Sequence, residues 1–546
     1  MQKMDNKLLM QCIEKRLALL DKLEDPGVFH TRIGLEKESL RTTHHGVLAQ
    51  TPHPAAWGAS LTHPYVTTDY AESLTELITP PLTTIPAVLD NLTALHTYVY
   101  QHLSDEMLWA ASMPCRLPEQ HQIPVSTYGS SNPGRMKQLY RVGLGHRYGR
   151  AMQVIAGVHF NWSMPDTFWP HYQDALNMSS TANRLRDMHS MGLVRNIIRY
   201  GWLIPYLFGA SPAVGRSFLQ AQPTALSLWD AETYYEPYAT SLRMGDMGYQ
   251  NSANNELVFE VQYHDVTSYA QSLLAATRAP AEPWQRLGVK VGDEYRQLNA
   301  KKLQIESEYY STVRPKQLVQ GMESSAVALA TRGINHIELR SLDVNLYEPS
   351  GVSQQQLYFL DAFMLTYLLA DSPPLEVAEQ QQSQQNLLAI AHQGRAEDLL
   401  LHQGRRAVSR QTWGLALLQA MEPVSSWLDQ QHQTQAYSRA LQEQQDKMRT
   451  PELTPSAMMM QDMQTKQTSY YGLVEHYSAA YQKNAQQRRL TEEQQRQFQQ
   501  LRVESQQRFA ALEAETTTDF DTFLADYFVS VAQAADNLPA EPLGQL

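Results

Sequence analysis

Short segments with charged or polar residues two positions apart constrain the fold of this chain more than any other feature. In residues 32–39, RIGLEKES, a strand would place Ile33 and Leu35 on one face and Glu36 and Glu38 on the other, because side chains alternate along a strand. At a rise of about 3.3 Å per residue, the Cα atoms of the two glutamates would lie roughly 6.5 Å apart. The pattern therefore predicts a strand with one apolar and one acidic face.

The same alternation returns in three further segments. It gives His159 and Asn161 a common face in residues 157–162, GVHFNW, and Glu338 and Arg340 a common face in residues 335–340, NHIELR. A further case is residues 303–308, LQIESE. Each segment alone is typical of an antiparallel sheet with one solvated face. If the segments share one sheet, their carboxylates, histidine, asparagine and arginine line one concave surface.

The segment between the first two strands, TTDYAESLTELITPP, contains three more carboxylates. As a helix it would place Glu72 and Glu76 four residues apart on one face. As a strand ending at Thr79 it would place Glu76 beside Ile78. The sequence leaves both structures open.

Clustered carboxylates raise one another's pKa unless a cation lies between them. Mg²⁺ prefers oxygen ligands and is commonly held by one or two carboxylates together with substrate phosphates. These segments lack sulfur ligands and contain few histidines, which disfavours Zn²⁺. We therefore expect Mg²⁺, with Mn²⁺ as an alternative.

Composition narrows the class of protein. The 546 residues carry 44 Lys and Arg against 56 Asp and Glu, a formal charge of −12 that argues against nonspecific nucleic-acid binding. Two cysteines, Cys12 and Cys115, are too few for a disulfide framework and favour a reducing cytoplasm. The most apolar stretch, from Gly201, is shorter than a membrane span and contains Pro205. We expect a cytoplasmic protein without a membrane or nucleic-acid partner.

The chain divides into two parts by pattern. Residues 1–375 mix alternating and helical segments with Gly and Pro, which predicts an α+β core that begins with an amphipathic helix near residues 9–20. Residues 376–546 are rich in Gln, Ala and Leu and predict a helical lobe packed on that core. Thr491 and Gln494 form a capping-box pattern at the start of its last part.

A series of blocks from about residue 30 to about residue 345 is specific enough to indicate a family. The blocks are GLEKESLR, LTHPYVTTDYAESLTELITPP, SMPC, YGSSNPGRMKQLYRVGL, RYGRAMQVIAGVHFNWS, YGWLIPYLFGASPA, YATSLRMGDMGY, LQIESEYYSTVRPK and INHIELRSLDVN. In this order they resemble the bacterial single-chain glutamate–cysteine ligases, also called γ-glutamylcysteine synthetases. The C-terminal part is similar to the family in length and position but diverges in sequence.

The resemblance implies a fold similar to that of glutamine synthetase, with a curved, mainly antiparallel sheet that forms a funnel flanked by helices. It also implies a reaction in which ATP phosphorylates the γ-carboxylate of L-glutamate and the amine of L-cysteine displaces phosphate. The product is γ-glutamylcysteine, made in the first step of glutathione biosynthesis. Such enzymes are typically monomeric and cytoplasmic, and glutathione inhibits them.

The resemblance also assigns roles to individual residues. Arg340 corresponds to the arginine that meets the transferred phosphate, and it acts with Glu36 and Glu338 in catalysis. The implied metal ligands are Glu36, Glu38, Asp69, Glu76, His159 and Glu338. The implied substrate-binding residues are Tyr70, Tyr140, Arg141, Leu144, Gln153, Arg243, Tyr249 and Tyr310, with Arg141 and Arg243 binding carboxylates.

Two other functions remain open. A related ligase would keep ATP, Mg²⁺ and the acyl phosphate but take another amine, because metal ligands do not select the nucleophile. A glycosidase could use Glu36 and Glu38 as its two carboxylates, since retaining enzymes need carboxyl groups about 5–5.5 Å apart.

Overall fold

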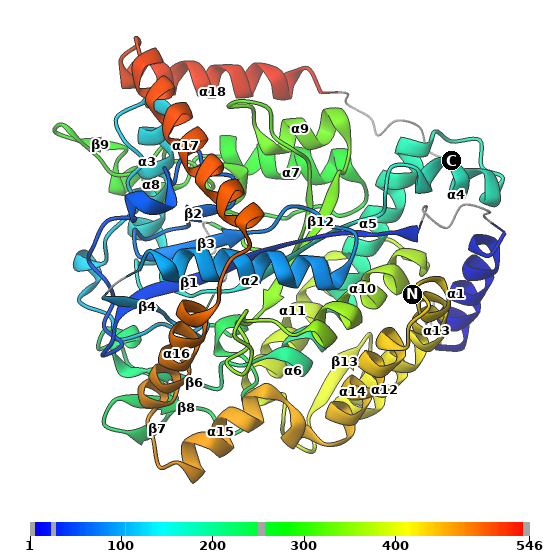
Figure 1. Cartoon of the computed structure of the whole chain (residues 1–546). Helices are drawn as coiled ribbons and strands as arrows, with labels where there is room; N and C mark the ends of the chain where they lie inside the picture. Colours follow the sequence, from blue (N-terminus) through cyan, green and yellow to red (C-terminus); the bar gives the residue numbers. More distant parts are fainter. Residues whose placement is uncertain (1–5, 23–28, 104, 249–256, 539–546) are drawn as a thin grey trace.

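A seven-stranded sheet, in which every paired strand is antiparallel to its neighbour, runs through the centre of the molecule (Figure 1). The structure is a computed structural model that describes residues 6–22, 29–103, 105–248 and 257–538. The strand order is β11-β12-β5-β1-β3-β2, and β4 pairs with the far end of β1. The strands are β1 (Arg32–Thr43), β2 (Val66–Thr68), β3 (Leu74–Ile78), β4 (Glu106–Leu108), β5 (Val158–Ser163), β11 (Val313–Lys316) and β12 (His336–Leu342).

The three segments predicted around Glu36, His159 and Glu338 are neighbouring strands, β1, β5 and β12. In the register of the sheet, Glu36 lies opposite His159, and Glu338 lies opposite Asn161. The predicted α+β class and antiparallel sheet are confirmed. The alternation of side chains therefore gathers the charged residues on one face.

The segment around Glu76 forms a strand, not a helix. Glu76 of β3 lies opposite Glu38 of β1, which puts both carboxylates on the charged face. Glu72 lies outside β3 and has another role, because its carboxylate accepts hydrogen bonds from the backbone N–H groups of His53 and Thr127, each at 2.8 Å. It thereby fixes the turn that precedes β3.

The prediction of a strand at residues 303–308 is wrong. A short 3₁₀ turn, Glu306–Glu308, occupies this place. Glu308 accepts a hydrogen bond from the backbone N–H of Gln304 at 2.7 Å and pairs with the buried Arg147, also at 2.7 Å. These side-chain bonds to nearby backbone replace a strand ladder.

Helices cover both faces of the sheet (Figure 1). Helices α2 and α10 pack on the apolar face, whereas α3, α7, α9 and α18 lie on the side of the charged face. The helices are α1 (Asn6–Leu20), α2 (Ile85–Gln101), α3 (Asn132–Tyr148), α4 (Phe168–Leu176), α5 (Ala182–Tyr200), α6 (Leu203–Phe208), α7 (Val266–Arg278), α8 (Glu282–Leu287), α9 (Ser325–Arg332), α10 (Gln354–Leu369), α11 (Val377–Gln393), α12 (Arg410–Ala420), α13 (Glu422–Gln431), α14 (Ala436–Arg449), α15 (Pro455–Thr465), α16 (Tyr470–Gln487), α17 (Glu492–Glu515) and α18 (Phe520–Asp536).

Among the residues that the structure describes, three small sheets lie outside the central one. They are β6 (Ala213–Gly215) with β7 (Ser227–Asp230) and β8 (Thr233–Tyr235), the hairpin of β9 (Lys290–Val291) and β10 (Glu294–Tyr295), and the hairpin of β13 (Leu400–Gln403) and β14 (Arg406–Ser409).

Within residues 376–538, the secondary structure is helical apart from the β13–β14 hairpin. The capping box predicted at Thr491 and Gln494 is present at the start of α17. Helices α12 and α14 lie beside α1 and α10, whereas α17 contacts α2, and α18 contacts α3 and α9. A division into a core of residues 1–375 and a lobe of residues 376–546 stays a proposal, and α18 returns to the core at its charged side.

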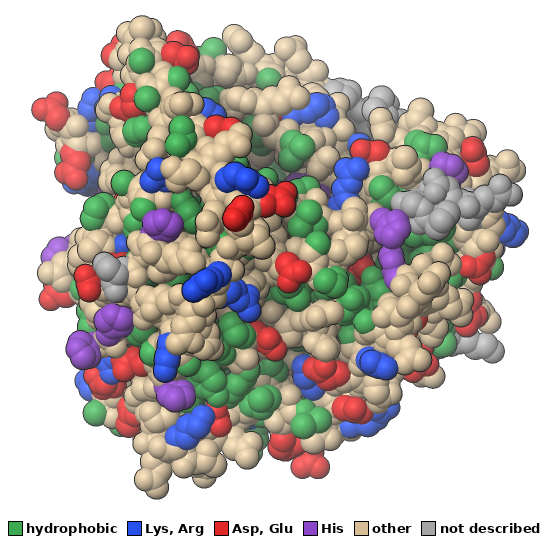
Figure 2. Space-filling model, in the orientation of Figure 1, with side chains coloured by type: hydrophobic (Ala, Val, Ile, Leu, Met, Phe, Trp, Pro, Cys, Tyr) green, Lys and Arg blue, Asp and Glu red, His purple; other side chains and the backbone are tan. Residues whose placement is uncertain are grey.

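The predicted N-terminal helix is α1, whose Leu9, Ile13, Leu17 and Leu20 are buried. Within the described residues, we find no helix with the length and hydropathy needed to span a bilayer. On the face drawn in Figure 2, acidic and basic side chains are interspersed, and neither sign forms one continuous patch. Glu38, His159 and Glu338 of the charged face are instead buried inside the molecule.

A buried carboxylate ties the sheet to the helices behind it. Asp361 of α10 is 2% exposed and accepts hydrogen bonds from Thr31 Oγ1, Trp162 Nε1 and Tyr437 Oη at 2.8–2.9 Å. Thr31 directly precedes β1, Trp162 lies on β5 and Tyr437 lies on α14. The Asp361 side chain thus joins strands β1 and β5 to helices α10 and α14.

Replacing Asp361 should destabilise the fold strongly. We expect Asp361→Ala to lower the free energy of unfolding by about 3 kcal/mol, because three buried donors lose their acceptor. The exposed Asp90→Ala on α2 should change it by less than about 0.5 kcal/mol. Guanidinium denaturation followed by circular dichroism measures both, and equal effects of the two variants would refute the role given to Asp361.

Candidate active site

A cavity of about 480 Å³ lies between the charged face of the sheet and α3. This volume is in the range of small-molecule sites. All six residues predicted as metal ligands line it, and they come from β1, β3, β5, β12 and the turn before β3: Glu36, Glu38, Asp69, Glu76, His159 and Glu338. The structure therefore brings together residues that are up to about 300 positions apart in sequence.

His159 stands at the centre of this cluster. Its Nδ1 lies 3.0 Å from Glu36 Oε2 and 3.6 Å from Glu338 Oε1, and its Nε2 lies 3.8 Å from Glu38 Oε1. Ligand atoms of Glu36, Glu76 and His159 all lie within 4.8 Å of one another. Such a spacing allows one cation to contact several of them.

Hydrogen bonds fix the orientation of the carboxylates. Glu36 accepts from Asn161 Nδ2 at 2.9 Å, and Glu38 accepts from the backbone N–H of Gly157 at 2.6 Å. Glu338 accepts from Arg340 Nη1 at 2.7 Å. Asn161, predicted on the charged face, therefore orients Glu36 from the neighbouring strand.

The carboxylates divide into two classes by pKa. Burial opposes ionisation of Glu36 and Glu338, but the hydrogen bond with His159 lowers the pKa of Glu36 to about 2, and Arg340 holds the pKa of Glu338 well below its ordinary value. Burial raises the pKa of Glu38, and burial together with Glu36 raises the pKa of Glu76 well above its ordinary value. The protein alone does not neutralise all four charges.

The donor set fits a hard divalent cation. It consists of carboxylate oxygens and one imidazole, and Mg²⁺ and Mn²⁺ favour such ligands. Glu338 Oε2 is buried without a hydrogen-bond partner among the described residues, and Lys316 Nζ lies 3.5 Å from it. A tautomer of His159 that donates from Nδ1 to Glu36 leaves Nε2 free to bind a cation.

Basic side chains line the same cavity beside the acidic cluster. Arg340 on β12 and Arg314 and Lys316 on β11 follow the edge of the sheet, and Lys137 and Arg141 face them from α3. Burial and the nearby Arg141 lower the pKa of Lys137 to about 7. A polyanion such as a nucleotide phosphate chain could therefore contact basic side chains of both the sheet and α3.

Most residues predicted to bind substrate line this cavity too. They are Tyr70, Tyr140, Arg141, Leu144, Gln153 and Tyr310. Gln153 Nε2 donates to Tyr310 Oη at 2.7 Å, which joins the turn after α3 to the loop before β11. Tyr249 falls outside the described residues.

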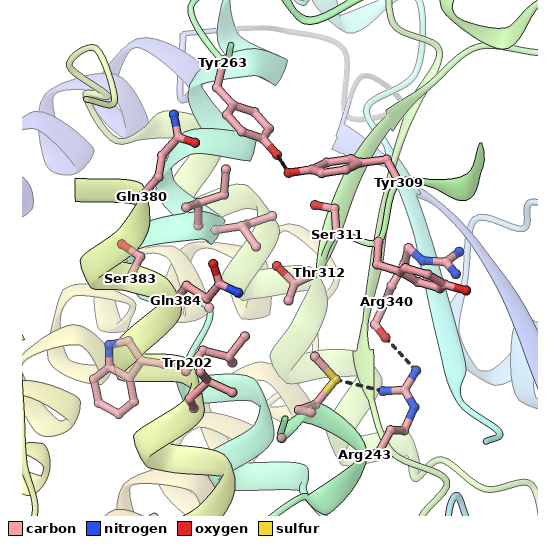
Figure 3. Close-up of a pocket in the computed structure, with 18 residues that line it drawn as sticks. Trp202, Arg243, Tyr263, Tyr309, Ser311, Thr312, Arg340, Gln380, Ser383 and Gln384 are labelled. Carbon is pink, nitrogen blue, oxygen red and sulfur yellow. Dashed lines mark hydrogen bonds between the residues drawn. The ribbon is translucent and has the colours of Figure 1, made fainter. Parts of the chain in front are cut away.

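The remaining predicted residue, Arg243, lines a second cavity of about 180 Å³ (Figure 3). Tyr310 and Arg340 line both cavities, so the two share a wall. In Figure 3, Gln380, Ser383 and Gln384 of α11 lie on one side, and Ser311, Thr312 and Arg340 lie on the other. The smaller cavity thus combines a basic end with uncharged polar groups.

The position of Arg243 is fixed by groups that lie far away in sequence. Its Nη2 donates to the backbone oxygen of Arg340 at 2.9 Å, and its Nη1 lies 3.7 Å from the buried Asp343 Oδ1. Asp343 also accepts from the backbone N–H of Ala210 and from Ser241 Oγ, both at 2.9 Å. A Cβ on Gly157 would lie 2.1 Å from Arg243 Nη2, so this guanidinium requires glycine at position 157.

Several lining residues carry no signal that the sequence patterns could detect. Lys137 and Met136 lie in a helix, and Tyr527 comes from the divergent C-terminal part. Only the regular spacing of Pro133, Lys137, Tyr140 and Leu144 marks one face of α3.

Comparison with known sequences gives one consistent result. The sequence model described as Glutamate-cysteine ligase matches residues 17–390. A glutamate–cysteine ligase of Alcanivorax borkumensis is 41% identical over 525 residues, which are 95% of this chain and 100% of that protein. One of Pseudomonas putida is 40% identical over 523 residues, which are 96% of this chain and 99% of that protein.

A solved structure agrees with the sequence comparison. The crystal structure of glutamate–cysteine ligase from Francisella tularensis in complex with AMP superposes with a TM-score of 0.86 at 31% identity. The match covers 93% of this chain and 99% of that one. The sheet and helices therefore adopt the glutamine-synthetase-like fold expected from the sequence.

A thermal-shift experiment tests the cation site. We expect MgCl₂ to raise the Tm of the wild-type protein by about 2–5 °C, because the cation binds the folded state. Glu76→Gln should raise the Tm without Mg²⁺, since it removes one of the repelling carboxylates, and should abolish the rise with Mg²⁺. The exposed Asp90→Asn serves as the control, and a Glu76→Gln protein that keeps the full Mg²⁺ response would refute the site.

Proposed function

Because the chain belongs to the glutamate–cysteine ligase family, we propose that its reaction takes place on the charged face of the sheet, in the larger cavity. The chain catalyses the ATP-dependent ligation of L-glutamate to L-cysteine, the first step of glutathione synthesis. The observation that supports this location is that five carboxylates and one imidazole line the same cavity as the basic side chains of β11, β12 and α3. The match to glutamate–cysteine ligases in sequence and structure excludes the glycosidase alternative.

The proposed chemistry has two steps. The γ-carboxylate of glutamate attacks the γ-phosphorus of ATP, which yields γ-glutamyl phosphate and ADP. The amine of cysteine then attacks the acyl carbon, the C–O bond to phosphate breaks, and the amine loses a proton. Both steps move negative charge onto phosphoryl oxygens, and preorganised cations stabilise such charge.

We assign the cation site to Glu36, Glu38, Asp69, Glu76, His159 and Glu338. When bound, Mg²⁺ or Mn²⁺ would neutralise phosphate charge and polarise the transferred group. The raised pKa of Glu76 and Glu38 supports this assignment, because these carboxylates need a positive partner to remain ionised together. Asp69 is 3.9 Å from Arg141 and lies at the border of the cluster.

Arg340 is the proposed contact of the transferred phosphate. Its guanidinium lies in the wall that the two cavities share and donates to Glu338. This pairing holds the planar group in place at the wall of the cavities. Arg340 therefore contributes orientation as well as charge.

We assign the amino-acid substrates to the end of the cavities around Tyr310. Arg243 and Arg141 would bind substrate carboxylates bidentately, and Tyr70, Tyr140, Leu144 and Gln153 would surround the cysteine side chain. Tyr70 is buried, and its hydroxyl has no hydrogen-bond partner among the described residues. A substrate carboxylate or thiol is a suitable partner for this hydroxyl.

Three further properties belong to the proposal. We infer a cytoplasmic enzyme, which the free thiols of Cys12 and Cys115 support. We infer a monomer, which is the state that the family resemblance implies. We also infer inhibition by glutathione, whose γ-glutamyl and cysteinyl parts have the chemistry of the two amino-acid substrates.

Phosphate release identifies the amine substrate. With ATP, Mg²⁺ and glutamate present, we expect cysteine to give at least roughly tenfold higher kcat/KM than ammonia, because the Tyr140 and Leu144 pocket contacts its side chain. L-2-aminobutyrate, which lacks the thiol, is the matched comparison and should fall between them. A higher kcat/KM with another amine would show that this chain is a related ligase of different specificity.

Gly157→Ala tests the placement of Arg243. The added methyl group must displace the guanidinium, so we expect KM for glutamate to rise roughly tenfold while the circular dichroism spectrum is unchanged. Gly192→Ala is the control, because its nearest contact would be an ordinary 3.5 Å. Unchanged kinetics for Gly157→Ala would place the glutamate carboxylate away from Arg243.

A further inference from the structure

Residues 236–246 form a loop around Arg243, the proposed ligand of the glutamate carboxylate. The loop follows β8 and contains the 3₁₀ turn Leu242–Met244. Arg243 and Gly245 of the loop line the smaller cavity, where Figure 3 shows the Arg243 guanidinium beside Arg340. The placement of the loop therefore decides where this guanidinium stands.

Helix α11 holds the part of the loop that precedes Arg243. The backbone N–H groups of Thr240 and Ser241 donate to the backbone oxygen of Ala391 at 2.9 and 3.2 Å, and Thr240 Oγ1 donates to that of Ile390 at 2.9 Å. Both oxygens belong to the last turn of α11, where carbonyl groups are available to partners outside the helix. The C-terminal end of α11 thus fixes the loop up to Ser241.

His392, the next residue of α11, joins the two sides of the loop. Its Nδ1 lies 2.8 Å from Glu236 Oε2, which precedes Arg243 in the chain, and its Nε2 lies 3.1 Å from Asp246 Oδ1, which follows Arg243. We call Glu236, His392 and Asp246 the clasp. One imidazole therefore bridges the loop from its first residue to its last.

Gly245 allows the imidazole to approach the loop closely. A Cβ at position 245 would lie 2.8 Å from His392 Nε2 and 3.0 Å from its Cε1. Atoms in a protein interior do not pack so tightly, so any other residue here would displace the ring or the loop. The ring therefore packs directly on the backbone that follows Arg243.

The surroundings of His392 favour its charged form. The hydrogen bond with Glu236 raises the pKa of His392, and although burial opposes this shift, the charges of Glu236 and Asp246 raise the pKa further. The C-terminal end of a helix also attracts a cation. The clasp is therefore an imidazolium between two carboxylates.

Two arginines also approach this end of α11, and both donate to backbone oxygens. Arg395 donates to those of Pro237 and Ala239, and Arg410 of α12 donates to that of Gly394. Their charges oppose protonation of the imidazole, but both of its ring nitrogens face carboxylates. The net shift of its pKa is upward.

Loss of the proton weakens the clasp without removing it. A neutral imidazole that donates from Nδ1 to Glu236 can accept at Nε2 from the backbone N–H of Asp246, which is 3.4 Å away. The bond from Nε2 to the Asp246 carboxylate is then lost, and such charge-assisted bonds are roughly twice as strong as neutral ones. The backbone after Arg243 is therefore held less firmly at high pH.

We propose that His392 is a positioning residue for the ligation, and that the clasp holds Arg243 where its guanidinium binds the glutamate carboxylate. This inference rests on the proposed function for the role of Arg243. His392 is not among the residues that line the two cavities, so it acts through the loop and not by contact with substrate. Asp343 and Arg340 fix the guanidinium, and the clasp fixes the backbone that carries it.

Steady-state kinetics test the effect on substrate binding. We expect His392→Ala to raise KM for glutamate roughly tenfold while KM for ATP stays within about twofold, because the loop shifts and the phosphate contacts remain. Asp246→Asn, at a side chain that is 70% exposed, should raise KM for glutamate roughly threefold with the fold intact by circular dichroism. His402→Ala, at an exposed residue of β13, is the control and should behave as the wild type.

The pH profile separates this role from a purely structural one. Because the pKa of His392 is raised in the folded protein, the clasp is complete at low pH and is lost as pH rises through that pKa. Between about pH 6.5 and 8.5, KM for glutamate should rise in the wild type and stay nearly level in His392→Gln, whose side chain does not titrate. Glu236→Gln should move the rise to lower pH, because it removes the main cause of the raised pKa.

Hydrogen exchange detects the clasp without turnover. His392→Ala should increase deuterium uptake at the backbone N–H groups of Met244 and Gly245, which bond within the loop at 3.0 and 3.2 Å. Peptides from β5 should exchange as in the wild type. Equal uptake in the loop, or the same pH profile in wild type and His392→Gln, would overturn the proposal.

Gly157→Ala distinguishes failure of this inference from failure of the proposed function. If Gly157→Ala raises KM for glutamate and His392→Ala does not, His392 has no positioning role and Arg243 keeps its own. If neither variant raises it, Arg243 does not bind glutamate and both assignments fall. A wild-type protein that does not ligate cysteine would refute the proposed function, and hydrogen exchange would still decide whether His392 holds the loop.

Discussion

Repulsion between carboxylates on one face of the sheet is the constraint on which the rest of the site depends. Glu36, Glu38, Glu76 and Glu338 are held close together by strand register, and folding cannot separate them without slipping the strands. His159 and Arg340 offset part of the charge, and the elevated pKa of Glu76 shows that part remains. The apolar face of the sheet, which Asp361 joins to the helices behind it, supplies stability that offsets the repulsion on the charged face.

The sequence predicted the charged face because its cause is local. Side chains alternate between the two faces of β1, β5 and β12 in the folded protein, as the sequence pattern indicates. Glu36, His159 and Glu338 could therefore be placed on one surface before their strands were known to be neighbours. The same pattern misled at residues 303–308, where Glu308 bonds to Gln304 and Arg147 instead of lying in a ladder. For Glu76, only the pairing with Glu38 decided between strand and helix.

Contacts between distant segments were beyond prediction. Asp343 holds Arg243 across 100 positions, and Gly157 leaves room for it, but the spacing of residues in the sequence does not indicate either contact. The contacts of α18 with α3, α7 and α9 follow from the packing of the whole chain. Family resemblance supplied the individual ligands, and the structure supplied their common cavity.

The position of α18 near the end of the chain has a consequence for folding during synthesis. Glu36 of β1 and Tyr527 of α18 both line the larger cavity. Between them a ribosome must add 491 residues (527 − 36), which takes roughly 25–100 s at about 5–20 residues per second. During this time a nascent chain has its acidic face but an incomplete cavity. Catalytic competence therefore arrives late in synthesis, after the strands that carry the ligands have had ample time to pair.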